Sequence, residues 1–414
     1  MLNIRGSLQL VFGQTVWAVA QALLLLYLAQ VSGLVLVGVV TVGFAVFAPV
    51  ALLLSFNLRT SVAINLLPKL EFRLLLLFRL ATSFVSVLIA ATAAWAVDSG
   101  SSNAVCAALL LSTKLIDNVA DLNVGLYQRD HRMGHIANSL NVRGIAILVA
   151  IGISIVAGLD ALTFCALAAG LYAATFVLFD MSRIDLRGGN ESDGPKASIR
   201  QTIGAIQKNW MSALFPAADN LHQNCLRLGA TLFFEISTVG LIGLALTAYA
   251  PMQLLVTAVG MKILPQLRQH QQEGDKEAFE KVRRMGMLYG LGIASATVVI
   301  AFFVPALLYE MVFKADGDLA KRVTVMVGLA NWLLPMCGLM SLSLIASQNT
   351  KRYLFGPILA VGVFWILVGI LAQLTTLALL HLCAAAFFAS ALRVLMSLGG
   401  QRGLLRRMIS NCLV

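Results

Sequence analysis

The sequence predicts an all-α polytopic membrane protein with about twelve transmembrane helices. Charged residues make up only 12% of the 414 residues and hydrophobic residues 59%, with a mean hydropathy of +0.87. A soluble domain needs roughly a quarter of its residues charged to cover its surface. The apolar residues also gather in runs of about 20, the length that crosses a hydrocarbon core about 30 Å thick. Because these runs do not alternate as barrel strands do, we expect helices, which satisfy their own backbone hydrogen bonds in lipid.

Twelve such runs follow one another along the chain. They lie near residues 8–31, 34–56, 74–97, 104–127, 142–159, 161–181, 206–230, 236–264, 285–308, 322–347, 354–374 and 376–397. The first follows Arg5 and could be taken for a signal peptide, but it continues past Gln21 with no small-residue cleavage site after a short core. We therefore interpret it as the first span.

The basic residues predict how the spans are oriented. With the N-terminus inside, 24 of the 30 Lys and Arg residues fall in cytoplasmic segments, among them Arg143 before the fifth span. Arg393, near the end of the last span, is expected to be an ordinary interfacial charge. The outer joints hold only Lys314, Lys321 and Arg322. This asymmetry is the one that the positive-inside rule expects, so both termini are predicted to be cytoplasmic.

The net charge of +11 is spread over short loops next to the membrane. Anionic membrane lipids are the simplest partner for such a distribution, and no nucleic-acid partner is predicted.

The two halves of the chain resemble each other at an ungapped offset of 202 residues. Val37-Gly38 then falls on Val239-Gly240, and Ala48-Pro49 falls on Ala250-Pro251. Apolar matches are common between membrane spans, but a shared Gly and Pro about twelve residues apart are harder to obtain by chance. Duplicated halves are typical of transporter folds.

The repeat predicts two six-helix bundles. The N-terminal half would be residues 1–182, the cytoplasmic linker 183–205, and the C-terminal half with a cytoplasmic tail 206–414. Each half has an even number of spans, so both enter the membrane in the same sense. A transported molecule would be expected in the cleft between the halves.

The fourth span carries a polar stripe. Lys114, Asp117, Asn118 and Asp121 are spaced by three or four residues and share one helix face. A charge in the membrane costs several kcal/mol or more, so this face must meet a partner helix or a wet cavity. The stripe either joins helices through a Lys114–Asp117 pair or lines a transport path.

The seventh span is too polar to face lipid all round. Its polar residues are Asp219, Asn220, His222, Gln223, Asn224 and Arg227. In the repeat it corresponds to the first span, where Gln14 and Gln21 are the polar residues. It either packs through polar contacts or lines a cavity, and His222 is either proton-linked or simply hydrogen-bonded.

The polar stripe of the fourth span runs into Gln128-Arg129, Arg132-Met133, Asn138-Ser139 and Arg143-Gly144. In this segment the chain resembles bacterial polysaccharide flippases of the Wzx type, within the multidrug/oligosaccharidyl-lipid/polysaccharide (MOP) exporter superfamily. Those proteins carry a similar K-x-x-D-x-x-x-D-x-x-x-G-x-x-Q-[RK] helix followed by R-M-x-x-I-A-x-S-x-x-x-R-G.

The exit of the eighth span, around Pro265, is also similar to theirs and implies a helix lying on the cytoplasmic surface. Glu277 with Lys281 and Glu280 with Arg284 would form i,i+4 pairs on that helix.

The resemblance implies a fold like that of multidrug and toxic-compound extrusion (MATE) transporters, with a cationic cavity that holds a pyrophosphate headgroup. Arg227 and Lys114 would serve there, with Arg79 as a third candidate unless it snorkels to the interface. The full set of headgroup candidates is Lys114, Arg227, Arg79, Asn118, Asn220, Asn224, Gln21 and Gln223. The groups that would either couple an ion or form structural pairs are Asp117, Asp121, Asp219 and His222.

The function that these features predict is a flippase. It would move a polyprenyl-(pyro)phosphate-linked oligosaccharide across the bacterial inner membrane by alternating access, for O-antigen (lipopolysaccharide), capsule or exopolysaccharide assembly. Other polysaccharide-assembly membrane proteins would be partners. Two alternatives stay open, a MATE-type cation-coupled drug antiporter and a membrane glycan polymerase or ligase.

The second alternative is weakened by the short outer joints and by the absence of metalloprotease, hydrolase and paired-carboxylate motifs on them, and no ATPase motif is present. The six scattered cysteines suit packing, so we predict a transporter that is not an enzyme and has no metal or other cofactor.

Overall fold

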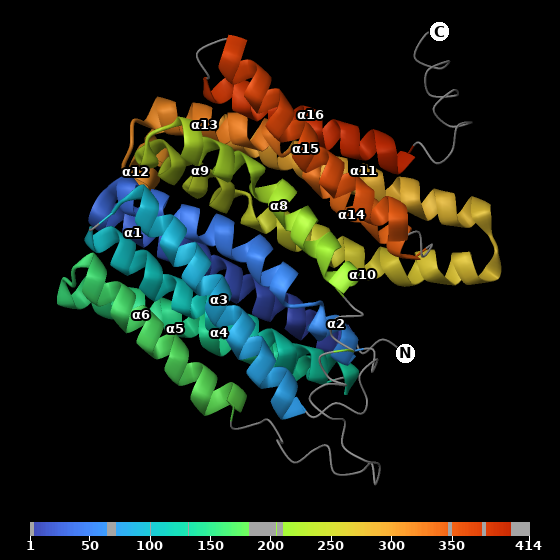
Figure 1. The fold of residues 1–414 in the computed structure, drawn as a ribbon, viewed down its shortest axis with the longest axis horizontal. Helices are drawn as coiled ribbons and strands as arrows, with labels where there is room; N and C mark the ends of the chain where they lie inside the picture. The colour runs from blue at the N-terminus through green and yellow to red at the C-terminus, as the bar shows by residue number, and fades with distance from the viewer. Residues whose placement is uncertain are drawn as a thin grey trace. The chain divides into compact units, whose positions relative to one another are not determined.

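A computed structural model describes residues 4–63, 72–99, 101–130, 132–181, 204, 210–346, 350–374 and 378–398. Every regular element in these ranges is a helix (Figure 1). The helices of the first half are α1 (Ile4–Leu54), α2 (Leu58–Ala63), α3 (Phe72–Val97), α4 (Ser102–Arg129), α5 (Met133–Ala157), α6 (Ala161–Thr175) and η1 (Phe176–Asp180). Those that follow are α8 (Trp210–Phe233), α9 (Ile236–Ala248), α10 (Ala250–Glu273), α11 (Lys276–Phe303), α12 (Ala306–Phe313), α13 (Gly317–Ala330), α14 (Leu334–Ala346), α15 (Thr350–Leu374) and α16 (Leu379–Leu398).

The described helices cover all twelve predicted spans, although some helices hold two spans and some spans consist of two helices. Eight described helices are long and apolar enough to cross a membrane, or nine if the bent pair α9 and α10 is one span. The 51-residue α1 contains two spans, divided at Gly33, whose φ of 77° suits glycine. The polar helices α4 and α8, of 28 and 24 residues, account for the two remaining predicted spans. The prediction of an all-α multi-pass membrane protein is confirmed.

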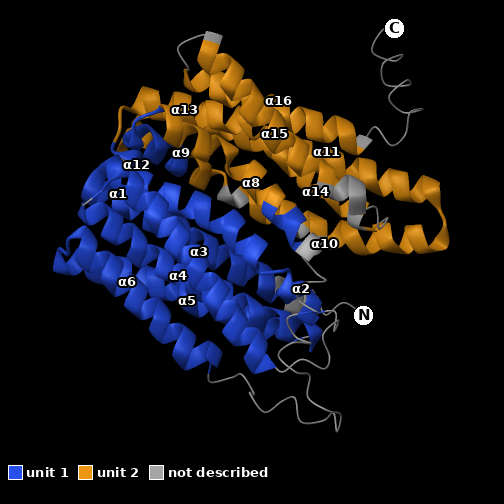
Figure 2. Cartoon of the chain, viewed as in Figure 1, with its two compact units in different colours: residues 1–217, 234–244, 312–314 blue, residues 218–233, 245–311, 315–414 orange. Residues whose placement is uncertain are grey.

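The chain forms two compact units (Figure 2). Unit 1 comprises residues 1–217, 234–244 and 312–314, and unit 2 comprises the rest. The predicted linker 183–205 lies, except for Gly204, outside the described residues. The boundaries of the two halves therefore stay a prediction.

Close helix packing in unit 1 brings α1 against α5. A Cβ on Gly144 of α5 would lie 3.1 Å from the Cα atom of Trp17 in α1. The absence of a side chain at Gly144 therefore lets the two helices approach at the level of Arg143. α4 and α6 pack against each other in the same unit.

In unit 2 the exit of the eighth span differs from the prediction. α10 runs through Pro265 to Glu273, and α11 begins at Lys276, so the two form a helical hairpin (Figure 1). Gly274, with φ 72°, and Asp275, whose side chain accepts from the Ala278 amide at 2.9 Å, make the turn. The segment after Pro265 is thus helical and largely exposed, but it forms the end of α10 and the start of α11 and not a helix of its own.

Candidate functional site

Three polar clusters lie inside the units, built on the stripes that the sequence predicts on α4 and α8. We call them the Lys114 cluster (Gln21, Lys114, Asp117, Arg143, Tyr172 and Trp17), the Arg79 cluster (Arg59, Arg79, Asn118 and Asp121) and the Arg393 cluster (Asp219, His222, Ser341, Ser390 and Arg393). The first two belong to unit 1 and the third to unit 2.

The Lys114 cluster joins four helices of unit 1. The Lys114 ammonium donates to Gln21 Oε1 at 2.8 Å and lies 3.4 Å from Asp117 Oδ2. It is also 5.1 Å from the ring centroids of both Trp17 and Phe44, a distance at which the rings attract a cation. The Lys114 side chain keeps 16% of its surface exposed. Gln21 and the two rings therefore surround the ammonium, while a small part of the side chain stays exposed.

Asp117 is the centre of this cluster. Its Oδ1 accepts from Arg143 NH1 at 2.7 Å and from the Tyr172 hydroxyl, which itself accepts from Trp17 Nε1 at 3.1 Å. The Arg143 guanidinium also lies 3.8 Å from Asp180 and is almost fully buried. When the neighbouring Asp180 is counted with the cluster, its two cations are balanced by two carboxylates.

The predicted place of Arg143 in a cytoplasmic loop is wrong. The predicted span begins at residue 142, whereas α5 begins at Met133 and places Arg143 inside the unit. Arg143, Tyr172 and Trp17 are the members of this cluster that sequence reasoning missed. The sequence signal for a buried Arg143 is the adjacent Gly144, because a glycine in a helix allows the close approach of another helix, here α1.

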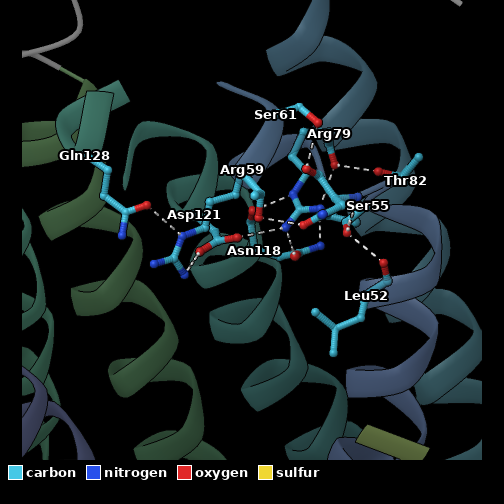
Figure 3. Close-up of polar contacts among 12 residues, drawn as sticks. Leu52, Ser55, Arg59, Ser61, Arg79, Thr82, Asn118, Asp121 and Gln128 are labelled. Carbon is cyan, nitrogen blue, oxygen red and sulfur yellow. Dashed lines mark hydrogen bonds and ion pairs between the residues drawn. The ribbon is translucent and has the colours of Figure 1, made fainter. Parts of the chain in front are cut away.

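The Arg79 cluster connects α2, α3 and α4 (Figure 3). Arg79 is 2% exposed and donates to the backbone carbonyl and side chain of Asn118, at 2.7 and 2.5 Å. Its NH2 lies 3.4 Å from Asp121, whose other oxygen pairs with Arg59 at 2.9 Å. The Arg79 guanidinium therefore points at α4 and does not snorkel toward the interface. Asn118 in turn donates to Ser83 at 2.7 Å.

In unit 2, Arg393 is buried at 3% exposure, so its predicted role as an interfacial charge is wrong. It pairs with Asp219 at 2.5 Å and contacts His222 Nδ1 at 3.1 Å and Ser341 Oγ at 3.1 Å. His222 Nε2 faces Ser390 Oγ at 3.3 Å. The Arg393 cluster therefore ties α8 to α14 and α16.

The polar stripe of α8 continues into a second group, the Arg227 triad of Asn220, Asn224 and Arg227. Arg227 NH1 donates to Asn224 Oδ1 at 2.8 Å, and Asn224 donates to Asn220 at 2.9 Å. Gln223, by contrast, donates to Asp219 at 3.0 Å. Among the described residues Arg227 has no carboxylate within ion-pair distance, and its Nε is buried without a hydrogen-bond partner.

No protein-family model matches the chain, and no curated protein matches it in sequence. Solved structures do match over nearly the whole chain. The lipid II flippase MurJ in its inward closed conformation has a TM-score of 0.67 and 12% identity, and the alignment covers 97% of this chain and 88% of that one.

Two further matches belong, by their descriptions, to the MOP superfamily. An outward-facing multidrug resistance MATE family transporter has a TM-score of 0.65 and 14% identity, with coverage of 96% and 94%. A transporter from Pyrococcus furiosus, described by the reverse polarity of its binding pocket, has a TM-score of 0.61 and 14% identity, with coverage of 95% and 94%. The chain is thus a multi-pass membrane protein with the fold of MOP-superfamily transporters and flippases.

Proposed function

We propose that the chain is a flippase for a polyprenyl-(pyro)phosphate-linked oligosaccharide in the bacterial inner membrane, serving O-antigen, capsule or exopolysaccharide assembly. The fold supports transport in general, and a lipid II flippase is among the proteins that share it. The choice of an anionic lipid-linked cargo rests on the charges inside the membrane helices.

Arg227 is the observation that carries this proposal. It is a half-buried guanidinium eighteen residues into a membrane-length helix, and the described residues provide it with an amide partner but no carboxylate. A cation in this position is expensive unless something compensates its charge. A phosphate or pyrophosphate suits it, because a guanidinium offers parallel N–H donors that match phosphate oxygens. Lys114, with its exposed fraction and aromatic neighbours, is the second cation that we assign to the headgroup.

The acids of the same helices favour this cargo over a cationic drug. Asp117 is held by Arg143, Asp121 by Arg59 and Arg79, and Asp219 by Arg393. An arginine already occupies the place that a drug cation, sodium ion or proton would need at each carboxylate. The description of the archaeal neighbour likewise connects the polarity of its pocket with a different function. In this chain the binding pocket would be positively charged.

His222 is not assigned to proton coupling. Arginine can only donate, so His222 Nδ1 accepts from Arg393 and the ring is neutral. A protonated ring would place two cations side by side. We expect His222→Gln to leave the pH dependence of transport unchanged between about pH 6 and about pH 8, where a coupled histidine would titrate. A pH profile of export that flattens in this variant would restore the coupling role.

The proposal is tested by complementation. The chain is expressed in a bacterium whose own polysaccharide flippase gene is deleted, and surface glycan is measured by labelling intact cells with a glycan-specific antibody or lectin. We expect surface glycan to return, with no change in resistance to cationic drugs. Resistance without surface glycan would instead identify a drug antiporter. The same chain carrying Arg284→Ala, which removes an exposed arginine in the first part of α11, is the matched positive control.

The same proposal includes cytoplasmic termini, membrane-lipid and membrane-protein partners, and a role as a transporter that is not an enzyme. Cytoplasmic termini would place the basic loops next to anionic lipids, and other polysaccharide-assembly membrane proteins would use the exported glycan.

A further inference from the structure

Two cysteines, Cys106 of α4 and Cys165 of α6, meet inside unit 1. Their side chains are hydrogen-bonded to each other, and the two residues are 1% and 0% exposed. The contact arises because α4 and α6 pack against each other in this unit. Tertiary packing therefore brings together two thiols that lie far apart in the sequence.

The thiol pair lies near one end of both helices. Cys106 lies four positions after Ser102, the first residue of α4, and Cys165 lies four positions after Ala161, the first residue of α6. Each thiol is thus about one helical turn from the start of its helix. Asp160, the exposed N-cap residue of α6, is close enough to interact electrostatically with both sulfurs. The pair therefore lies next to an exposed joint and not in the middle of the spans.

The predicted orientation places this end of the helices outside the cytoplasm, because the fourth and sixth spans both start from the outer face. Compartments outside the bacterial cytoplasm are oxidising, and disulfides form and persist there. Two thiols in hydrogen-bond contact need only small side-chain rotations to reach the S–S bond length of about 2 Å. The contact and its position both favour oxidation of the pair.

The other buried cysteines differ from this pair. Cys225, Cys337 and Cys383 lie in α8, α14 and α16. Cys337 Sγ donates to the Ser390 carbonyl at 3.7 Å. In the part of the chain that the structure describes, none of the three is hydrogen-bonded to a second cysteine. The predicted packing role suits these three, whereas the other two form a dithiol.

We propose that Cys106 and Cys165 form a disulfide that joins the outer ends of α4 and α6. The oxidant is a thiol oxidase of the outer compartment that carries a disulfide of its own. One cysteine thiolate attacks that disulfide and releases one oxidant thiolate, and the second cysteine thiolate then attacks the sulfur of the first and releases the other. Two electrons pass from the cysteines to the oxidant, and the two cysteine protons end on the oxidant's thiols.

The bond would strengthen a helix contact on which the Lys114 cluster depends. Farther along the same two helices, the Tyr172 hydroxyl of α6 donates to Asp117 of α4. A cross-link stabilises more when it closes a longer loop, and this loop includes most of α4 and all of α5. The disulfide would therefore hold α4 against α6 in unit 1. This effect does not depend on the identity of the cargo.

The disulfide is tested by counting free thiols on the full-length protein, from cells quenched in acid so that no thiol oxidises after lysis. The denatured protein is treated with a maleimide that carries polyethylene glycol, and each reacted cysteine adds one mass step on a gel. Of the six cysteines, we expect four to react before reduction and all six after it. Cys106→Ser should give five steps in both conditions, because Cys165 then has no partner.

Cys383→Ser is the matched control, because Cys383 is also buried and lies four positions after Leu379, the first residue of α16. It should give three steps before reduction and five after. Six steps before reduction in the unchanged chain would overturn the disulfide, and three before reduction in Cys106→Ser would assign it to other cysteines. If Cys106→Ser does not reach the membrane, Cys165→Ser provides the same comparison. Four steps in a strain that lacks the thiol oxidase would overturn the assigned oxidant.

The stabilising effect is measured on the purified protein. Reduction is expected to lower the midpoint temperature of thermal aggregation by about 5 °C in the unchanged chain and to leave Cys106→Ser unaffected. An unchanged midpoint beside a count of four thiols would overturn the role of the bond in holding α4 against α6. Neither measurement uses transport, so a failed export assay would refute the proposed cargo and leave the disulfide standing.

Discussion

Asp117→Asn is expected to destabilise the folded protein strongly. The Asp117 carboxylate accepts from Arg143 and Tyr172 on one oxygen and faces Lys114 on the other. Asparagine removes the negative charge and replaces one carboxylate oxygen by an NH2 group, which can only donate and so cannot serve the cations around it. Breaking one side of a buried ion pair costs about 3–5 kcal/mol, because the remaining charge stays buried without compensation. Asp180, at 3.8 Å from Arg143, is too distant to replace the lost partner fully.

The measurement is the midpoint temperature of thermal aggregation in detergent. It is obtained from the fraction of protein that stays monodisperse after heating. Asp130→Asn is the matched control, because the Asp130–Arg129 pair is about 40% exposed on both sides and such pairs contribute about 1 kcal/mol or less. Combining Asp117→Asn with Arg143→Gln should recover part of the loss, since the two positions act as a pair. Equal midpoints for Asp117→Asn and Asp130→Asn would show that Asp117 does not hold the cluster together.

The face of α4 that carries the cluster could be predicted from the sequence, because helical spacing is a local property. Residues 114, 117, 118 and 121 must share a face on any helix, and the structure brings the first two and the last two into separate clusters on that face. The partners could not be predicted in the same way. Tyr172 lies 55 residues from Asp117 and reaches it only through the packing of α6 on α4.

Charges near the ends of apolar runs cannot be placed from the sequence for a related reason. Arg143 and Arg393 lie close to the limits of their apolar runs, and a charge there is compatible with a loop, a snorkelling side chain or a buried pair. Only tertiary packing decides between these, by placing Asp117 beside Arg143 and Asp219 beside Arg393. The polar character of α8 was the available hint for Arg393, because Asp219 in a membrane-length helix requires a cation somewhere.

Arg227→Ala is expected to abolish export of the lipid-linked glycan while the protein still folds. In the described residues Arg227 makes no ion pair, so its removal leaves no buried carboxylate unpaired and loses only the bond to Asn224. Charge-assisted hydrogen bonds contribute about 1.5–3 kcal/mol each, so losing a bidentate contact to phosphate should lower the export rate by about a hundredfold or more. Surface glycan in the complemented deletion strain is the readout, normalised to the amount of protein in the membrane.

Arg227→Lys separates charge from geometry. Lysine keeps the positive charge but supplies a point charge in place of a guanidinium edge, so we expect export to fall only about tenfold if the ligand is a phosphate. The buried Nε of Arg227 has no partner, and burying an unsatisfied donor is costly. An anion that accepts from the guanidinium would remove that cost, which is why the arginine is expected to exceed the lysine. Normal export by Arg227→Ala would remove the observation on which the proposed cargo depends, whereas equal loss in both variants would show that the guanidinium edge, and not the charge alone, is required.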